Sequence, residues 1–233
     1  MRPNVVLWSY IHMIVVTIAH RAGNNRSLLR DALAADVDAL EVDLRLDGGR
    51  LVARHERRFP FLPLYHDHWR WRLRFGRQIT LEELLENVGG RAALLLDLKS
   101  TSVPALRQLV KVVRAHGGLA GHRASTNYWH LLRLLKQSAP ELKLYYSIGN
   151  PQELARFWEM QESTHEAKGV SIKDTLLDGI LIDRFRHEGV EILAYGVYDL
   201  ERARQLAEWG VAGIISGDLA VLSAFKSTHS PHK

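Results

Sequence analysis

The amino-acid sequence predicts an α/β protein, a single-domain (β/α)8 TIM barrel. Short runs of β-branched and aliphatic residues alternate with segments whose apolar residues recur at helical spacing, and this alternation repeats about eight times. The chain has 233 residues, which agrees with the roughly 250 residues typical of such a barrel. A doubly wound open sheet is the second candidate, because it shows the same alternation.

The expected elements follow one another in a regular order. The expected barrel strands are 14–20, 39–46, 92–99, 122–127, 142–149, 169–174, 191–197 and 212–217. The expected helices are 25–36, 80–89, 103–117, 128–140, 151–161, 175–189 and 200–210. Asn25 or Ser27 can cap the first helix, Thr80 with Glu83 forms a capping box before the second, and Gly117 ends the third. A returning strand at 50–56 begins a short insertion after strand two.

The chain is expected to form one domain over residues 1–233, because it contains no internal repeat, linker or low-complexity segment. An apolar run over residues 5–18 is shorter than the ~20 residues of a transmembrane helix. It leads directly into His20 with no cleavage site of the A-x-A type, which argues against a signal peptide. We therefore interpret residues 1–13 as an extra lead-in to the first strand.

The amino-acid composition limits the kinds of metal site and binding partner that the protein can have. The absence of cysteine excludes disulfides and Cys-based zinc sites, so a metal would be bound by His, Asp or Glu. The net charge of +5 favours anionic partners. Basic residues cluster at 54–77, interleaved with Trp69 and Trp71, a composition that suits a membrane surface, although these Trp could equally pack under a loop. No nucleic-acid reader module is recognisable, and no obligate protein partner is expected.

Polar side chains recur at the C-terminal ends of otherwise apolar strands. This is where barrel enzymes carry their active sites. The residues concerned are His20, Arg21, Glu41, Asp43, His55, Asp97, Lys99 and Lys173. Core packing does not require this pattern.

Three of these residues predict a metal site. Glu41 and Asp43 are two positions apart on one strand, so they share a face with Cα atoms about 7 Å apart. Asp97 occupies the corresponding position on the neighbouring strand. Carboxylates gathered at a barrel mouth repel one another, and a hard divalent cation, Mg²⁺ or Ca²⁺, would relieve the repulsion. The alternative is that Glu41 and Asp43 form the solvent-facing half of an ordinary strand.

The ordered set of motifs resembles the glycerophosphodiester phosphodiesterase family, within the phosphatidylinositol-phospholipase-C-like barrels. The matching motifs are His20-Arg21-Ala22, Glu41-Val42-Asp43, Asp47-Gly48-Gly49, His55-Glu56 and Asp97-Leu98-Lys99. The resemblance extends nearly over the full length. The departures are Ala22 for Gly, Glu56 for Asp, Asp97 for Glu, Tyr195 for Trp and Gly217 for Asp. They bear on substrate identity more than on reaction class.

The resemblance implies metal-dependent cleavage of a glycerophosphodiester to an alcohol and glycerol 3-phosphate. His20 and His55 would be the catalytic acid and base, in an order that the sequence leaves open. Arg21 and Lys99 would bind the substrate phosphate, and Glu41, Asp43 and Asp97 the metal. Lys173 and Tyr195 are further candidates for substrate contact from their strand positions alone, and a structural role is the alternative for both.

Two other functions remain open. The Asp97-x-Lys99 spacing also looks like the lysophospholipase D and sphingomyelinase D branch, which would act on membrane lipids. A non-catalytic barrel that binds phosphate esters is the other alternative. The expected substrate is a small phosphodiester or a lysophospholipid, and the expected location is the cytoplasm, with peripheral membrane contact through 54–77.

The hairpin after strand two has two candidate registers. A three-residue loop at Asp47-Gly48-Gly49 would pair Leu46 with Arg50 and place His55 opposite Glu41. A two-residue Gly48-Gly49 loop would shift the pairing by one and turn His55 to the other face. The mechanism above requires the first register, and a structure with His55 on the far face would contradict its catalytic role.

Overall fold

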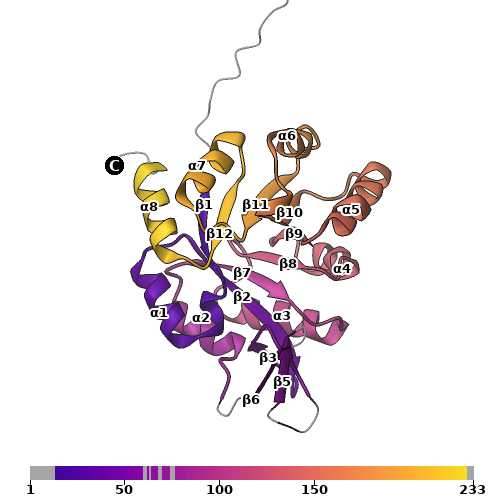
Figure 1. Ribbon diagram of the computed structural model, residues 1–233. Helices are drawn as coiled ribbons and strands as arrows, with labels where there is room; N and C mark the ends of the chain where they lie inside the picture. Colours follow the sequence, from indigo (N-terminus) through magenta and orange to yellow (C-terminus); the bar gives the residue numbers. More distant parts are fainter. Residues whose placement is uncertain (1–13, 60–61, 63, 68–69, 74–76, 230–233) are drawn as a thin grey trace, which may run out of the picture.

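Eight parallel strands of the described chain close into a barrel, with helices packed around the outside (Figure 1). The computed structural model describes residues 14–59, 62, 64–67, 70–73 and 77–229. Around the barrel the strand order is β1-β2-β7-β8-β9-β10-β11-β12, and β12 pairs with β1 to close it. The predicted (β/α)8 fold is therefore confirmed, and the open sheet is excluded.

The elements lie close to their expected positions. The barrel strands are β1 (Val16–Ala19), β2 (Ala39–Asp47), β7 (Ala93–Leu98), β8 (Arg123–Thr126), β9 (Lys143–Ile148), β10 (Gly169–Lys173), β11 (Glu191–Tyr195) and β12 (Gly213–Ser216). The helices are α1 (Arg26–Ala34), α2 (Leu81–Val88), α3 (Val103–Ala115), α4 (His130–Ser138), α5 (Pro151–Thr164), α6 (Gly179–His187), α7 (Leu200–Trp209) and α8 (Leu219–His229). Short 3₁₀ turns follow β1 (η1, Ala22–Asn24) and β10 (η2, Asp174–Leu176).

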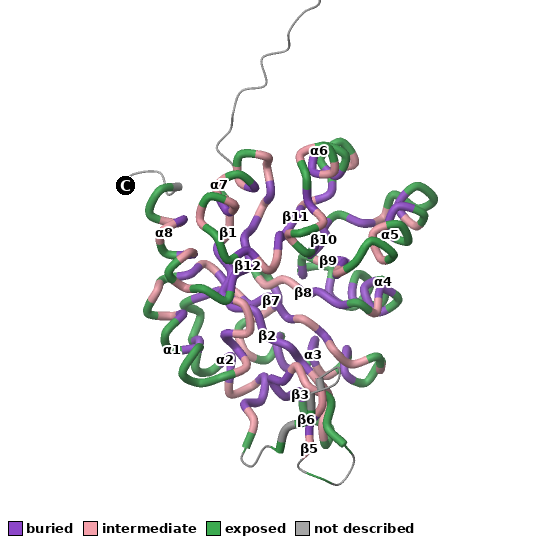
Figure 2. Tube along the Cα trace, in the orientation of Figure 1, coloured by how far each residue is buried: buried purple, intermediate pink, exposed green. Residues whose placement is uncertain are grey.

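Strand alternation separates two apolar layers. Leu40, Val42 and Leu44 of β2 point outward and pack beneath the helices in the larger core. Residues of the opposite parity fill the barrel interior with a second cluster: Ile18, Ala39, Leu95, Tyr145, Leu193 and Ile215. The buried strands and the exposed outer helix faces are evident in Figure 2. The interior cluster closes the barrel below its C-terminal mouth.

The helix ends carry the predicted caps. Thr80 accepts a hydrogen bond from the Glu83 amide, and the Glu83 carboxylate accepts one from the Thr80 amide, which completes the capping box of α2. Asn25, rather than Ser27, caps α1 by accepting from the Ser27 and Leu28 amides. These local signals explain why the helix starts are readable from sequence.

The hairpin after β2 has the two-residue register. Gly48 and Gly49 have φ of +56° and +80°, as a two-residue hairpin turn with both φ positive requires. Asp47 pairs with Arg50, so the expected pairing of Leu46 with Arg50 is wrong. The regular strand β3 (Arg50–Ala53) ends before His55. One further ladder bond follows, from the Arg54 amide to the Asp43 carbonyl at 2.7 Å.

The insertion continues into a small antiparallel sheet of β4 (Arg57–Arg58), β5 (Leu64–Asp67) and β6 (Arg70–Leu73), which projects from the barrel beside β3 (Figure 1). Exposed apolar side chains on it are Phe59, Leu62, Trp71 and Leu73. Trp69 and the lead-in 1–13 lie outside the described residues. None of the helices in the described ranges combines the length and hydropathy needed to cross a bilayer.

Asp38 ties the start of the barrel to the last helix. Its Oδ2 accepts hydrogen bonds from the Thr17 amide at 2.8 Å and the Thr17 hydroxyl at 2.6 Å. Its Oδ1 accepts one from the Lys226 ammonium of α8 at 2.9 Å. Burial raises the pKa of Asp38, but the hydrogen bonds from Thr17 and Lys226 outweigh it, so the pKa lies below its ordinary value.

We expect Asp38→Asn to lower the free energy of unfolding by about 1–3 kcal/mol, because an amide cannot satisfy both Thr17 and Lys226. Since the folded-state pKa is lowered, the stabilisation is complete above the unfolded value of about 3.9 and is lost as pH falls through the folded pKa. Urea unfolding at a series of pH values should show a constant gap between the two proteins near neutrality that closes in acid.

Asp36→Asn is the matched control, because Asp36 also pairs with Lys226 but through a side chain that is 93% exposed. It should cost at most about 1 kcal/mol. A gap for Asp38→Asn that stays the same at every pH would contradict the assigned role of the carboxylate.

Candidate functional site

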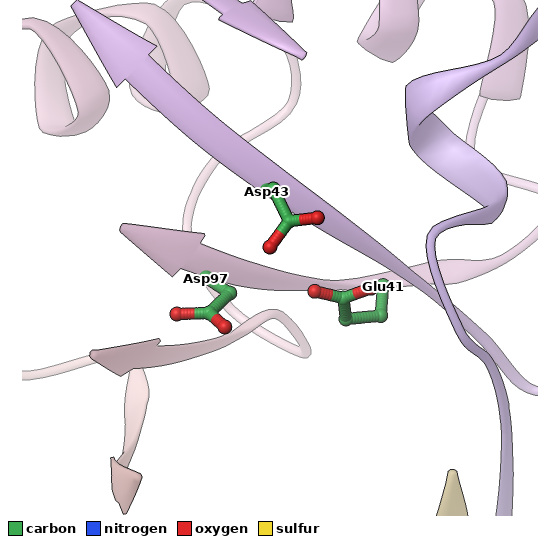
Figure 3. A group of neighbouring side chains, drawn as sticks. All are labelled: Glu41, Asp43 and Asp97. Atoms are coloured by element: carbon green, nitrogen blue, oxygen red, sulfur yellow. The ribbon is translucent and has the colours of Figure 1, made fainter. Parts of the chain in front are cut away.

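Three carboxylates meet at the C-terminal mouth of the barrel (Figure 3). Glu41 and Asp43 come from β2, and Asp97 comes from β7, where it is the direct ladder partner of Asp43. One oxygen from each lies within 4.8 Å of the others. The strand parity that sends Leu40, Val42 and Leu44 outward necessarily sends this set inward. The predicted grouping of these residues is confirmed.

The carboxylates are buried, and their pKa values are displaced accordingly. Burial raises the pKa of Glu41 well above its usual range, and the charges of Asp43 and Asp97 add to the effect. Burial also raises the pKa of Asp97, although Lys99 opposes it. For Asp43, burial is outweighed by the positive charges of Lys99, His55 and Arg21, so its pKa is lowered. The cluster thus holds more negative charge than its surroundings readily accommodate.

The turn η1 directs backbone and side-chain donors at these carboxylates. Arg21 adopts the left-handed conformation, with φ of 55°, which is unfavourable for a residue with a Cβ. In this conformation its amide donates to Glu41 Oε2 at 2.6 Å, and its Nε lies 3.3 Å from Asp43 Oδ2. Gly23 lets the turn pack closely, because a Cβ there would lie 2.6 Å from Cβ of Val42.

Asn24 fixes the orientation of Asp43. Its amide nitrogen donates to Asp43 Oδ2 at 2.7 Å, and its carbonyl oxygen accepts from the Asp43 backbone amide at 3.0 Å. The Asn24 side chain therefore forms hydrogen bonds with both the backbone amide and the carboxylate of Asp43. Sequence reasoning missed Asn24, although its place three residues after Arg21, in the loop that follows the first strand, was the available signal.

Lys99 provides a positive charge in direct contact with two of the three carboxylates. Its ammonium lies 2.6 Å from Asp97 Oδ2 and 3.4 Å from Asp43 Oδ1. Burial alone would lower the pKa of Lys99, but the two aspartates raise it above its ordinary value. The side chain therefore stays protonated.

His20 follows β1 and is half-buried, with Nε2 at 4.0 Å from Glu41 Oε2. Burial, reinforced mainly by the charge of Arg21, lowers the pKa of His20 to about 4. At neutral pH the imidazole is therefore uncharged.

His55 follows β3, and its backbone carbonyl accepts a hydrogen bond from Arg45 Nε at 2.9 Å. Its charge acts to lower the pKa values of Asp43, Asp97 and His20. The structure has the two-residue register, which was expected to turn His55 away from the carboxylates, but regular pairing ends at Ala53, so the ladder does not set the face that His55 occupies.

The two weaker candidates differ in position. Tyr195 at the end of β11 is half-buried, and burial, reinforced first by Glu153, raises its pKa to about 12; Lys99 and Asp97 also influence it. The Tyr195 hydroxyl would lie 2.9 Å from a Cβ at Gly149. Lys173 pairs with Tyr195 across the ladder and is exposed. Tyr195 thus borders the carboxylates electrostatically, whereas no contact with them is seen for Lys173 within the described chain.

The carboxylate cluster fits a hard divalent cation. Asp97 Oδ1 is buried and accepts no hydrogen bond from the described residues, which is costly for an oxygen in an apolar setting. An all-oxygen, negatively charged donor set is what Mg²⁺ and Ca²⁺ prefer.

Comparison with known proteins shows which folds are similar. No family model matches the sequence, and no curated protein matches it. Among solved structures, a Silicibacter pomeroyi protein assigned as a glycerophosphoryl diester phosphodiesterase superimposes with a TM-score of 0.75 at 19% identity, covering 93% of this chain and 94% of its own. A glycerophosphodiester phosphodiesterase from Parabacteroides distasonis gives 0.70 at 17% identity, covering 93% and 98%.

A phosphodiesterase from Oleispira antarctica, solved in complex with the product sn-glycerol-3-phosphate, gives a TM-score of 0.70 at 18% identity and covers 91% of this chain and 95% of its own. Many of the neighbours are glycerophosphodiester phosphodiesterases, and the match covers most of each chain. At these identities, the comparison establishes a shared barrel fold.

The left-handed Arg21 generates a prediction about stability. Arg21→Gly should be more stable than Arg21→Ala by about 1 kcal/mol, because glycine adopts this conformation without a Cβ penalty. Both variants keep the amide that donates to Glu41 and lose the same guanidinium. Chemical denaturation of the two variants measures the difference, and an Ala variant at least as stable as the Gly variant would contradict the assigned backbone conformation.

Proposed function

We propose that residues 1–233 form one catalytic unit, a glycerophosphodiester phosphodiesterase that releases glycerol 3-phosphate and an alcohol. The observation that carries the proposal is the buried Glu41-Asp43-Asp97 cluster, flanked by His20 and the Lys99 cation, at the mouth of a barrel shared with enzymes of that name. A barrel mouth that combines anions, cations and imidazoles suits a substrate with a charged phosphate and two ester oxygens.

Glu41, Asp43 and Asp97 would hold Mg²⁺ or Ca²⁺. Such an ion, when bound, polarises a phosphoryl oxygen and stabilises the charge that builds up during displacement at phosphorus. Arg21 would offer its planar guanidinium to the phosphate, and Lys99 would add a point charge. Cationic groups that strengthen their contacts as charge develops lower the barrier rather than merely tightening binding.

His20 and His55 would transfer the protons. One imidazole removes the proton from the attacking hydroxyl, which belongs either to water or to a neighbouring alcohol of the substrate. The new P–O bond forms as the P–O bond to the leaving alcohol breaks, and the other imidazole protonates that alcohol. Attack by water gives glycerol 3-phosphate directly, whereas attack by the substrate's own hydroxyl gives a cyclic phosphate that a water molecule then opens to glycerol 3-phosphate. Each acid-base role is typically worth about 10²–10⁴-fold in rate.

A small glycerophosphodiester is the favoured substrate. The Oleispira antarctica neighbour was solved with sn-glycerol-3-phosphate as its product, and its fold likeness extends over most of this chain. A site built for that product would recognise the glycerol phosphate half and leave the alcohol half less constrained.

A lysophospholipase D-like activity on membrane lipids is the second candidate. The small sheet carries the exposed apolar side chains of Phe59, Leu62, Trp71 and Leu73 next to the exposed Arg57. A surface that mixes aromatic, aliphatic and cationic groups suits a phospholipid headgroup region. On this proposal the enzyme is cytoplasmic and touches a membrane through residues 54–77.

The first test is a release assay with glycerophosphocholine, glycerophosphoethanolamine and lysophosphatidylcholine, each with Mg²⁺, Ca²⁺ or EDTA. We expect release of glycerol 3-phosphate from the glycerophosphodiesters, abolished by EDTA and lowered at least 10²-fold by His20→Ala. His187→Ala, at an exposed position on α6, is the matched control and should retain full activity.

Choline release from the lysolipid alone would move the protein to the second candidate. Absence of turnover with every metal and substrate would contradict catalysis and favour a barrel that binds phosphate esters without cleaving them.

Asn24 provides a test that does not require turnover. Asn24→Ala should weaken Mg²⁺ or Ca²⁺ binding by about 10–100-fold, because groups that orient a metal ligand contribute that much. The measurement is the rise in unfolding temperature with metal concentration. Asn25→Ala, which removes only the cap of α1, should lower stability without changing the metal dependence; equal effects of the two variants would contradict the role of Asn24.

A further inference from the structure

Arg45 connects two residues of the proposed site through their backbones. It lies on β2 two positions beyond Asp43 and therefore on the same face of the strand. Its Nε–H donates to the His55 carbonyl at 2.9 Å, and its Nη1–H donates to the Lys99 carbonyl at 2.8 Å. One half-buried guanidinium thus joins the chain after β3 to the chain after β7.

This contact is made where the chain leaves the β2–β3 ladder. If the β2–β3 ladder continued in its observed register, His55 would stand opposite Val42, whose side chain packs in the helix-side core. The ladder makes its last bond from the Arg54 amide, and the carbonyl of the following residue, His55, accepts a hydrogen bond from Arg45 Nε. The imidazole then lies where its charge influences Asp43 and Asp97.

The chemistry of the side chain suits this task. Nε and Nη1 of a guanidinium diverge within a rigid plane, so they reach two carbonyls at a fixed separation. A lysine ammonium at this position would have its donors on one atom at the end of a flexible chain. Arg45 is therefore not interchangeable with lysine as a bridge between two backbone segments.

We propose that Arg45 is a positioning residue: it turns the His55 segment toward the barrel mouth and fixes it relative to Lys99. Its catalytic consequence rests on the proposed function, but the positioning itself does not. Because His55 and Lys99 would act on the same phosphodiester, a displacement of either by about 1 Å can lower the rate by about 10²-fold.

The test compares Arg45→Ala, Arg45→Lys and wild type in the release assay. We expect kcat to fall by about 10²-fold in Arg45→Ala and to be partly restored by added guanidinium ion, which can rebuild the two hydrogen bonds. Arg45→Lys should recover less activity than guanidinium-treated Arg45→Ala. A normal kcat in Arg45→Ala would overturn the proposal.

Arg202 supplies the matched control. Its Nη2 donates to the Asp174 and Leu177 carbonyls, so it also bridges two backbone groups but touches none of the proposed catalytic residues. Arg202→Ala should lose stability, keep its kcat and show no response to guanidinium. An equal loss and an equal rescue in both variants would mean that Arg45 acts only through general stability.

Crystal structures of wild type and Arg45→Ala decide the positioning independently of turnover. We expect the His55 carbonyl and imidazole to move away from Asp43 in the variant while Glu41 and Asp97 stay in place; an unchanged His55 would overturn the proposal. Should Arg45→Ala fail to fold, the crystal structure of Arg45→Lys is compared with wild type instead, and the same movement of His55 is expected. If wild type shows no turnover but His55 moves, the proposed function fails and the positioning role stands.

Discussion

The structure depends on one constraint: three carboxylates are buried together at the mouth of a closed barrel. Removing ions from water is expensive, and like charges at such short distances repel strongly outside bulk solvent. Hydrogen-bond donors and a cation from the surrounding chain stabilise these carboxylates: the Arg21 amide, the Asn24 side chain and the Lys99 ammonium. Even the unfavourable backbone of Arg21 serves this purpose, because it aims an N–H group at Glu41. Asp97 Oδ1 still accepts no hydrogen bond from the described residues, and a bound cation would give this oxygen a partner.

The barrel separates stability from chemistry along its axis. Ile18, Leu95 and Leu193 fill the interior below the carboxylates and exclude water from that level. The outward-facing residues of the same strands bury the helices, independently of the mouth. Because each strand contributes alternate residues to these layers, a polar residue at a strand end changes the chemistry without disturbing the core beneath it. The function of a protein with this fold therefore has to be inferred from the residues at the barrel mouth, because similarity of fold alone does not establish it.

Much of the fold was predictable, since strand and helix periods differ and the caps at Asn25 and Thr80 are local signals. The carboxylate cluster was predictable because two-residue spacing on parallel neighbours forces a common face. The hairpin register was not, because Gly48 and Gly49 permit either loop length. The position of His55 depends on a hydrogen bond from Arg45, which no local pattern encodes. Asn24 and Asn25 are adjacent and identical, yet one orients Asp43 and the other caps α1; only the tertiary structure distinguishes them.

The proposed function depends on a divalent cation bound by Glu41, Asp43 and Asp97. Isothermal titration calorimetry with Mg²⁺ and with Ca²⁺ tests it most directly, on wild type, Asp43→Asn and the exposed-site control Asp36→Asn. One ion should bind per chain in wild type and in Asp36→Asn, and no binding should be detectable in Asp43→Asn. Failure of wild type to bind either ion, or undiminished binding by Asp43→Asn, would contradict it.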